Sequence, residues 1–118
     1  AIAAVAARGE EAVGALATAL DPSSSLAVRR HAIWALTRIN SQAACAAVRV
    51  ALADPDPAAR LTAVASASTT RDAGAVDRLL ELVQSDEPPV RREAATALGR
   101  IGDRRAAPAL LERKGLMR

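Results

Sequence analysis

Three residues suited to binding recur at four-residue intervals in the first third of the chain. They are Arg30, Trp34 and Arg38, and this spacing places all three on one side of an α-helix. Arginine binds carboxylates and phosphates through its planar guanidinium, and both residue types are over-represented among dominant interface residues. The spacing therefore favours a binding stripe. The alternative is that the indole of Trp34 covers a neighbouring helix with an arginine stacked on it.

The charges of this stripe return later in the chain. Arg92, Thr96 and Arg100 have the same spacing, whereas the corresponding middle positions hold Leu61, Ala65 and Thr69. Such a surface has arginines at both ends and an apolar middle. It suits an acidic peptide, a phosphate-bearing ligand or a partner helix.

The other residue types that support catalysis are poorly placed for it. His31 is the single histidine, and the nearby serines 23–25 lie where serine ordinarily caps a helix. Cys45 falls on an apolar helix side, where a free cysteine behaves as a small hydrophobe. The acidic pairs lack the ligand number of a calcium loop: Asp54 with Asp56, and Asp86 with Glu87. We therefore expect no enzyme activity, no metal and no cofactor.

The composition predicts packed helices. The chain of 118 residues is 51% hydrophobic but only 1% aromatic, and much of the apolar content is alanine. Alanine is the best helix former, whereas sheets favour the aromatic and β-branched residues. The net charge of +3, from 16 basic and 13 acidic residues, is modest. Nucleic-acid binding is therefore possible but not favoured, and an acidic protein partner is compatible with it.

An internal repeat of 31 residues organises the chain. Apolar positions 28–39, 59–70 and 90–101 superimpose as one helix, termed helix B, with alanine at its fifth position each time. A preceding helix A has its apolar positions at 13–20, 45–52 and 76–83. An aspartate and one or two prolines separate the two helices, because proline ends one helix and begins the next. Stacked helix pairs of fixed period indicate an all-α solenoid.

The third helix B carries a family resemblance. Its sequence from Pro89 to Asp103, PVRREAATALGRIGD, resembles the HEAT-like repeats of bilin-lyase-type (PBS-lyase) proteins. Tetratricopeptide and ankyrin repeats fit poorly because their signature motifs are missing. The resemblance implies a right-handed α-solenoid whose B helices line a concave groove.

The resemblance also implies a structural ladder along the repeats. In it, an arginine at one position of each helix B hydrogen-bonds an inter-helix turn and its aspartate. The arginines are Arg29, Arg60 and Arg91, and the aspartates are Asp21, Asp54 and Asp86. Ligand contact by these arginines is the alternative.

We expect a single domain over residues 1–118, in a chain that is a fragment of a longer protein. The repeats are predicted at about 10–40, 41–71 and 72–102, with 1–9 as the end of a truncated helix and 103–118 as the start of a further repeat. The middle helix B is rich in alanine, serine and threonine, so we expect the lowest local stability there. The apolar opening is too short to span a bilayer, and a cytoplasmic location is favoured.

The leading functional hypothesis is a non-catalytic scaffold that binds a protein through the concave helix-B surface, with Arg30, Trp34, Arg38, Arg92 and Arg100 as candidate contacts. Contact with neighbouring domains or end-to-end self-association is also compatible with the repeats. The resemblance implies two alternatives. One is a bilin lyase subunit, and the other is a DNA-binding protein of the alkyl-base glycosylase type.

Overall fold

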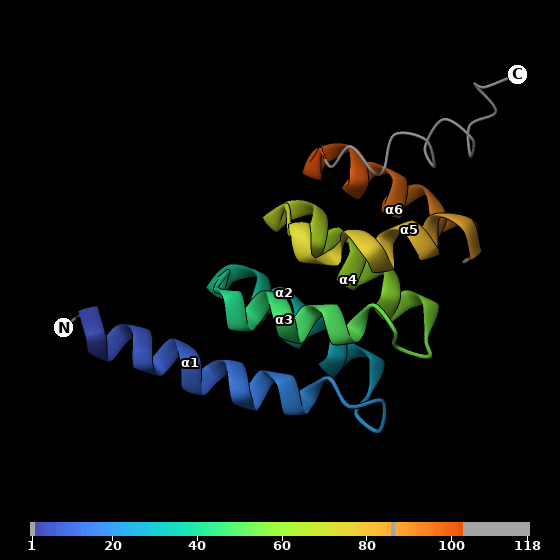
Figure 1. Cartoon of the computed structure of the whole chain (residues 1–118). Coiled ribbons are helices and arrows are strands. Elements are labelled where there is room, and N and C mark those ends of the chain that lie inside the picture. The colour runs from blue at the N-terminus through green and yellow to red at the C-terminus, as the bar shows by residue number, and fades with distance from the viewer. Residues whose placement is uncertain (1, 86, 103–118) are drawn as a thin grey trace, which may run out of the picture.

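A computed structural model describes residues 2–85 and 87–102, with side chains described for 11–84 and 87–102. The predicted further repeat at 103–118 and the ladder residue Asp86 lie outside this part of the chain. Within it the fold is entirely helical, as predicted. The elements are α1 (Ile2–Ala19), α2 (Leu26–Ile39), α3 (Gln42–Ala51), α4 (Pro57–Thr70), the short 3₁₀ helix η1 (Ala73–Ala75), α5 (Val76–Ser85) and α6 (Pro88–Ile101) (Figure 1).

Short polar side chains cap the N-termini of α2, α3 and α4. Ser25 and Ser41 accept hydrogen bonds from the backbone N–H groups three residues ahead, at 3.2 and 3.0 Å. Asp56 caps α4 by accepting from Ala58 at 2.8 Å, with Pro57 at the first helical position. These side chains satisfy N–H groups that have no partner within the helix, which fixes where each helix starts.

Residues in the left-handed conformation end α2, α4 and α6. Asn40, Arg71 and Gly102 have φ values of 48°, 51° and 77°, and the backbone N–H of each closes the last helical turn. Glycine adopts this conformation freely and asparagine tolerates it, whereas arginine does so at some cost.

The helices stack in one direction as two layers (Figure 1). The B layer consists of α2, α4 and α6, with α4 packed against both others; the A layer consists of α1, α3 and α5, and each A helix packs on the B helix that follows it. The core lies between the layers and includes the fully buried Ile33, Leu36, Val64, Leu79 and Leu98. The small residues Ala63 and Ala67, 0% and 2% exposed, let the B helices approach closely.

One predicted boundary is wrong. We expected residues 1–9 to end a separate helix, but α1 continues without a break from Ile2 to Ala19. A glycine inside a helix costs only about 1 kcal/mol relative to alanine, and neither proline nor a capping aspartate follows Gly9. The local signal was therefore too weak to end the helix.

Candidate binding surface on the B helices

All the predicted contact residues are exposed on the B helices. On α2, Arg30, Trp34 and Arg38 lie opposite the buried Ala32, Ile33 and Leu36, and 39% of Trp34 is accessible. On α6, Arg92 and Arg100 are exposed in the same way. Because α2 and α6 each pack on α4, and the arginines occupy equivalent positions of the repeat, we expect them to form two ridges on either side of α4. Whether these residues contact a partner stays a prediction.

The middle helix forms a low floor between these ridges. Leu61 and Ala65 are half-buried on α4, and Thr69 is exposed with its hydroxyl donating to the Ala65 carbonyl at 3.0 Å. We call the two ridges and this floor together the helix-B face. Its residues are Arg30, Trp34, Arg38, Leu61, Ala65, Thr69, Arg92, Thr96 and Arg100.

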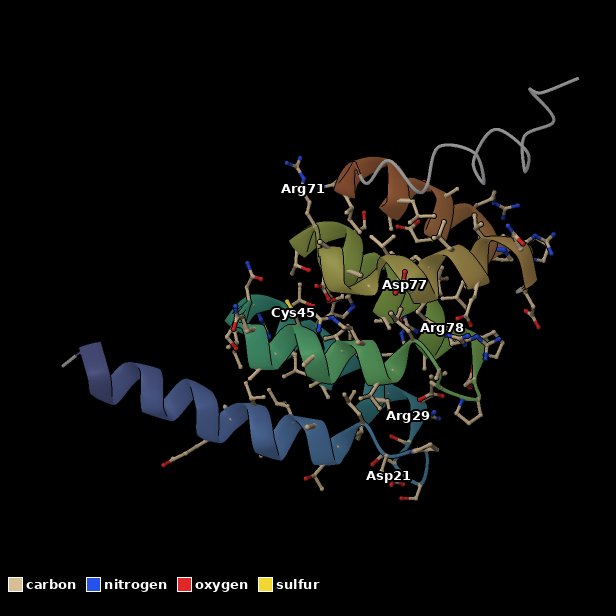
Figure 2. The ribbon with its side chains drawn as sticks, in the orientation of Figure 1. Asp21, Arg29, Cys45, Arg71, Asp77 and Arg78 are labelled. Atoms are coloured by element: carbon tan, nitrogen blue, oxygen red, sulfur yellow. The ribbon has the colours of Figure 1, made fainter. Side chains whose placement is uncertain are left out.

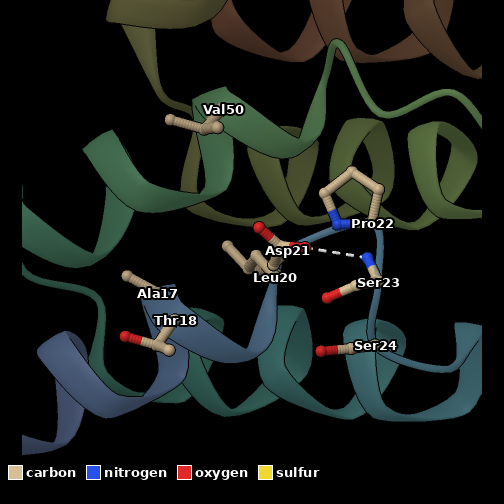
Figure 3. Close-up of a pocket in the computed structure, with 8 residues that line it drawn as sticks. All are labelled: Ala17, Thr18, Leu20, Asp21, Pro22, Ser23, Ser24 and Val50. Atoms are coloured by element: carbon tan, nitrogen blue, oxygen red, sulfur yellow. Dashed lines mark hydrogen bonds between the residues drawn. The ribbon is translucent and has the colours of Figure 1, made fainter.

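Two of the surface hollows are lined entirely by described residues. The first, of about 260 Å³, lies between the first turns of α4 and α6 and is lined by Leu61, Pro89 and Val90, together with Asp56 and Glu87. The second, of about 530 Å³, lies beside the turn between α1 and α2 and is lined by Leu20, Pro22 and the exposed Val50 (Figure 3). Only the first adjoins the helix-B face, because Leu61 belongs to both.

The arginine and aspartate ladder crosses from one repeat to the next. Arg29 of α2 donates to the Asp54 carboxylate in the turn before α4, at 2.5 Å, and this carboxylate also accepts from the Asp56 N–H at 2.9 Å. The side chains of Arg29 and Asp54 are only 9% and 2% exposed. Arg60 of α4 donates to the carbonyls of Asp54 and Pro55 at 2.7 and 3.1 Å. This turn is therefore held by arginines from two repeats.

The remaining ladder residues are arranged differently. Asp21 is exposed, and its carboxylate accepts from the Ser23 N–H at 2.8 Å (Figure 3). Hydrogen bonds from Ser23, and to a smaller extent the charge of Arg29, lower the pKa of this carboxyl group below 3.8. Arg91 of α6 is half-buried at the equivalent position.

Comparison with known protein families identifies the repeats. A family model of HEAT repeats matches residues 46–114, which is more than half of the chain. The chain belongs to the HEAT repeat family. A search of curated proteins found no match.

A solved structure has the same fold. Human deoxyhypusine hydroxylase, determined in complex with glycerol, superimposes on 95% of this chain with a TM-score of 0.76 and 25% sequence identity. The chain covers 46% of that enzyme's length. The α-solenoid predicted from the sequence is thereby confirmed.

The HEAT repeats are also joined by two arginines that the sequence did not reveal. Arg49 of α3 donates from Nε and Nη2 to both carboxylate oxygens of Asp72, each at 2.7 Å, and these bonds raise the pKa of Arg49. Arg78 of α5 points toward the end of α3 (Figure 2), where it donates to the Leu52 carbonyl at 3.3 and 3.4 Å. Neither arginine recurs at its repeat position, so aligning the repeats gave no signal.

The remaining candidates for chemistry stand apart. His31 is exposed beside the stripe, and Cys45 is half-buried, with its thiol 3.8 Å from the side-chain oxygen of Asn40. Within the described residues, no three histidine, cysteine or acidic side chains gather into a group that could hold a metal ion. In the same part of the chain, no helix combines the length and apolar character needed to cross a membrane.

Proposed function

We propose that this HEAT-repeat chain is a non-catalytic protein-interaction module that uses its helix-B face. The observation that carries the proposal is the exposure of Trp34 and four arginines on one face of the B layer. A large aromatic residue flanked by arginines is the composition of interface hot spots. HEAT repeats generally mediate protein interactions, which supports the same role.

An affinity capture with three versions of the chain tests this proposal. The first is the natural chain, and the second replaces Arg30, Trp34 and Arg38 with alanine. The third is a matched control that replaces the exposed Thr18, Val50 and Gln84 of the A layer with alanine. We expect the second version to lose partners that the first and third both retain. Circular dichroism checks that all three are folded.

Equal retrieval of partners by all three versions contradicts the proposal. The fluorescence of Trp34 gives an independent readout, because it is the single tryptophan and its indole is partly exposed to water. We expect its emission to move to shorter wavelength when a captured partner is added back. Unchanged emission would place the contact elsewhere on the chain.

Binding measurements with the natural chain distinguish the two alternatives that the family resemblance implies. A DNA-binding role predicts steeply salt-dependent binding of a duplex, because arginines displace counterions from phosphates. A role with bilins predicts a change in visible absorbance when a bilin is added. The helix-B face supports a protein partner better, because its floor is apolar and Asp56 and Glu87 stand at one end.

A further inference from the structure

The helix-B face has the width of one α-helix. Neighbouring packed helices lie about 8–10 Å apart, so the ridges on α2 and α6 are separated by about 16–20 Å across α4. A helix with its side chains is about 10–12 Å wide. The floor is made of shorter side chains than the ridges, with Ala65 between Leu61 and Thr69. An approaching helix can therefore settle between the two ridges.

The floor offers an anchoring position at one end. The hollow of about 260 Å³ beside Leu61 has walls formed by Pro57, Pro89 and Val90, and it is large enough for one aliphatic side chain. From Leu61 to Thr69 the floor extends eight residues along α4, or about 12 Å. A partner helix therefore makes two or three turns of contact.

The charge of the face selects the partner. Arg30 and Arg38 line one ridge, and Arg92 and Arg100 line the other. The carboxylates at this face stand near the hollow, where Asp56 already accepts the cap hydrogen bond from Ala58. A complementary partner thus carries acidic side chains on both flanks and an uncharged apolar residue over the hollow.

We propose that the helix-B face binds a single acidic amphipathic helix, with one aliphatic side chain seated in the hollow beside Leu61. The inference rests on the proposed function, because it requires this face to be the docking surface. It adds the conformation, charge and anchoring position of the segment that docks there.

Three fluorescein-labelled synthetic peptides of about 18 residues, or five helical turns, test it. The first has leucines at helical spacing with glutamates on both flanks. The second is the same peptide with two interior prolines, which prevent a helix. The third has lysines in place of the glutamates. By fluorescence anisotropy we expect the first to bind, more weakly at high salt, and the other two to bind at least about tenfold more weakly.

Substitutions on the chain locate the site. Leu61→Arg places a long charged side chain on the floor. The fold accommodates it, because α2 and α6 carry arginine at the same repeat position. We expect it to weaken binding of the first peptide at least about tenfold. Arg38→Gln with Arg100→Gln should weaken it similarly. Gln42→Glu with Gln84→Glu, which changes the net charge equally on exposed A-layer positions, should leave binding within about twofold.

Each other outcome overturns the inference. Equal binding of the proline peptide excludes a helical partner, and equal binding of the lysine peptide excludes an acidic one. Binding that survives Leu61→Arg places the peptide elsewhere. If the first peptide does not bind, the inference falls, while capture of partners that depend on Trp34 still decides the proposed function separately. Circular dichroism of Leu61→Arg checks that a loss of binding is not a loss of fold.

Discussion

The two layers of helices are held together by different forces. In the B layer, α4 packs directly on α2 and α6 through small buried residues such as Ala63 and Ala67. Among the described residues, α3 and α5 of the A layer have no comparable packing, and arginine hydrogen bonds join them instead. Because the B helices pack on one another more extensively than the A helices do, the close packing that fixes the shape of the solenoid lies beside the helix-B face.

The largest difference in stability is expected between disrupting the Arg29–Asp54 pair and disrupting the Arg49–Asp72 pair. Asp54→Asn leaves the guanidinium of Arg29 buried without a countercharge, and we expect a loss of about 3 kcal/mol in the free energy of unfolding. Asp72→Asn removes the countercharge of Arg49, whose side chain is 38% exposed, and should cost about 1 kcal/mol or less. Urea unfolding of both variants measures this. Equal losses of stability would mean that the deeper burial of the Arg29–Asp54 pair does not make it contribute more than the Arg49–Asp72 pair.

A second experiment tests whether Ala67 weakens the packing of α4 or is needed for the close approach of α4 to its neighbours. The same repeat position holds Leu36, Ala67 and Leu98, each almost completely buried, and the sequence alone suggests that the alanine leaves α4 weak. If the close approach of α4 to its neighbours requires it, Ala67→Leu should destabilise the fold by about 1–3 kcal/mol through overpacking. Ala65→Leu, which adds the same atoms on the half-buried floor of the helix-B face, should change stability by less than about 0.5 kcal/mol. A stabilising Ala67→Leu would show that the B layer is underpacked.

A smaller difference in stability is expected between alanine substitutions at two glycines, one in the B layer and one beside the A layer. A Cβ on Gly99 of α6 meets nothing within 4 Å, so Gly99→Ala should stabilise the helix by about 0.5–1 kcal/mol. A Cβ on Gly74 comes within 3 Å of three guanidinium atoms of Arg49. Gly74→Ala should therefore displace Arg49 from Asp72 and destabilise the fold by about 1 kcal/mol or less. The Gly74 effect should disappear when Asp72→Asn is already present; an undiminished effect would place its cause outside this pair.

Packing positions that recur in every repeat were predicted from the sequence, whereas interactions that occur in a single repeat were not. Ala32, Ala63 and Ala94 occupy one repeat position and are all buried, because the same packing requirement returns in every repeat. The Arg49–Asp72 pair depends on an arginine that has no counterpart in the other repeats, so it became visible only when the chain was folded. The partner of Arg29 was ambiguous for another reason. Aspartates recur in successive turns, and only the stacking of one repeat on the next brings Asp54 to this arginine.

The candidate surface was predictable for a simpler reason. Arg30, Trp34 and Arg38 lie on one side of one helix, and helical periodicity sets this without tertiary information. The hollow beside Leu61 depends on the distance between α4 and α6. That distance follows from the small residues buried between the helices, which sequence patterns do not measure.

The smallest expected effect concerns the exposed aspartate of the first turn, which shows how a turn carboxylate behaves outside a buried pair. Hydrogen bonds from Ser23 lower the pKa of Asp21 below 3.8, so their contribution to stability is present above pH 3.8 and is lost as the pH falls through the lowered pKa. Carboxyl carbon NMR shifts should titrate below pH 3.8 in the natural chain. In Ser23→Ala the midpoint should rise only part of the way to 3.8, because the backbone N–H of residue 23 still donates. Ser24→Ala is the matched control and should leave the midpoint unchanged; a midpoint unaffected by Ser23→Ala would show that the Ser23 hydroxyl does not lower the pKa of Asp21, and would leave the backbone N–H of residue 23 and the charge of Arg29 as its causes.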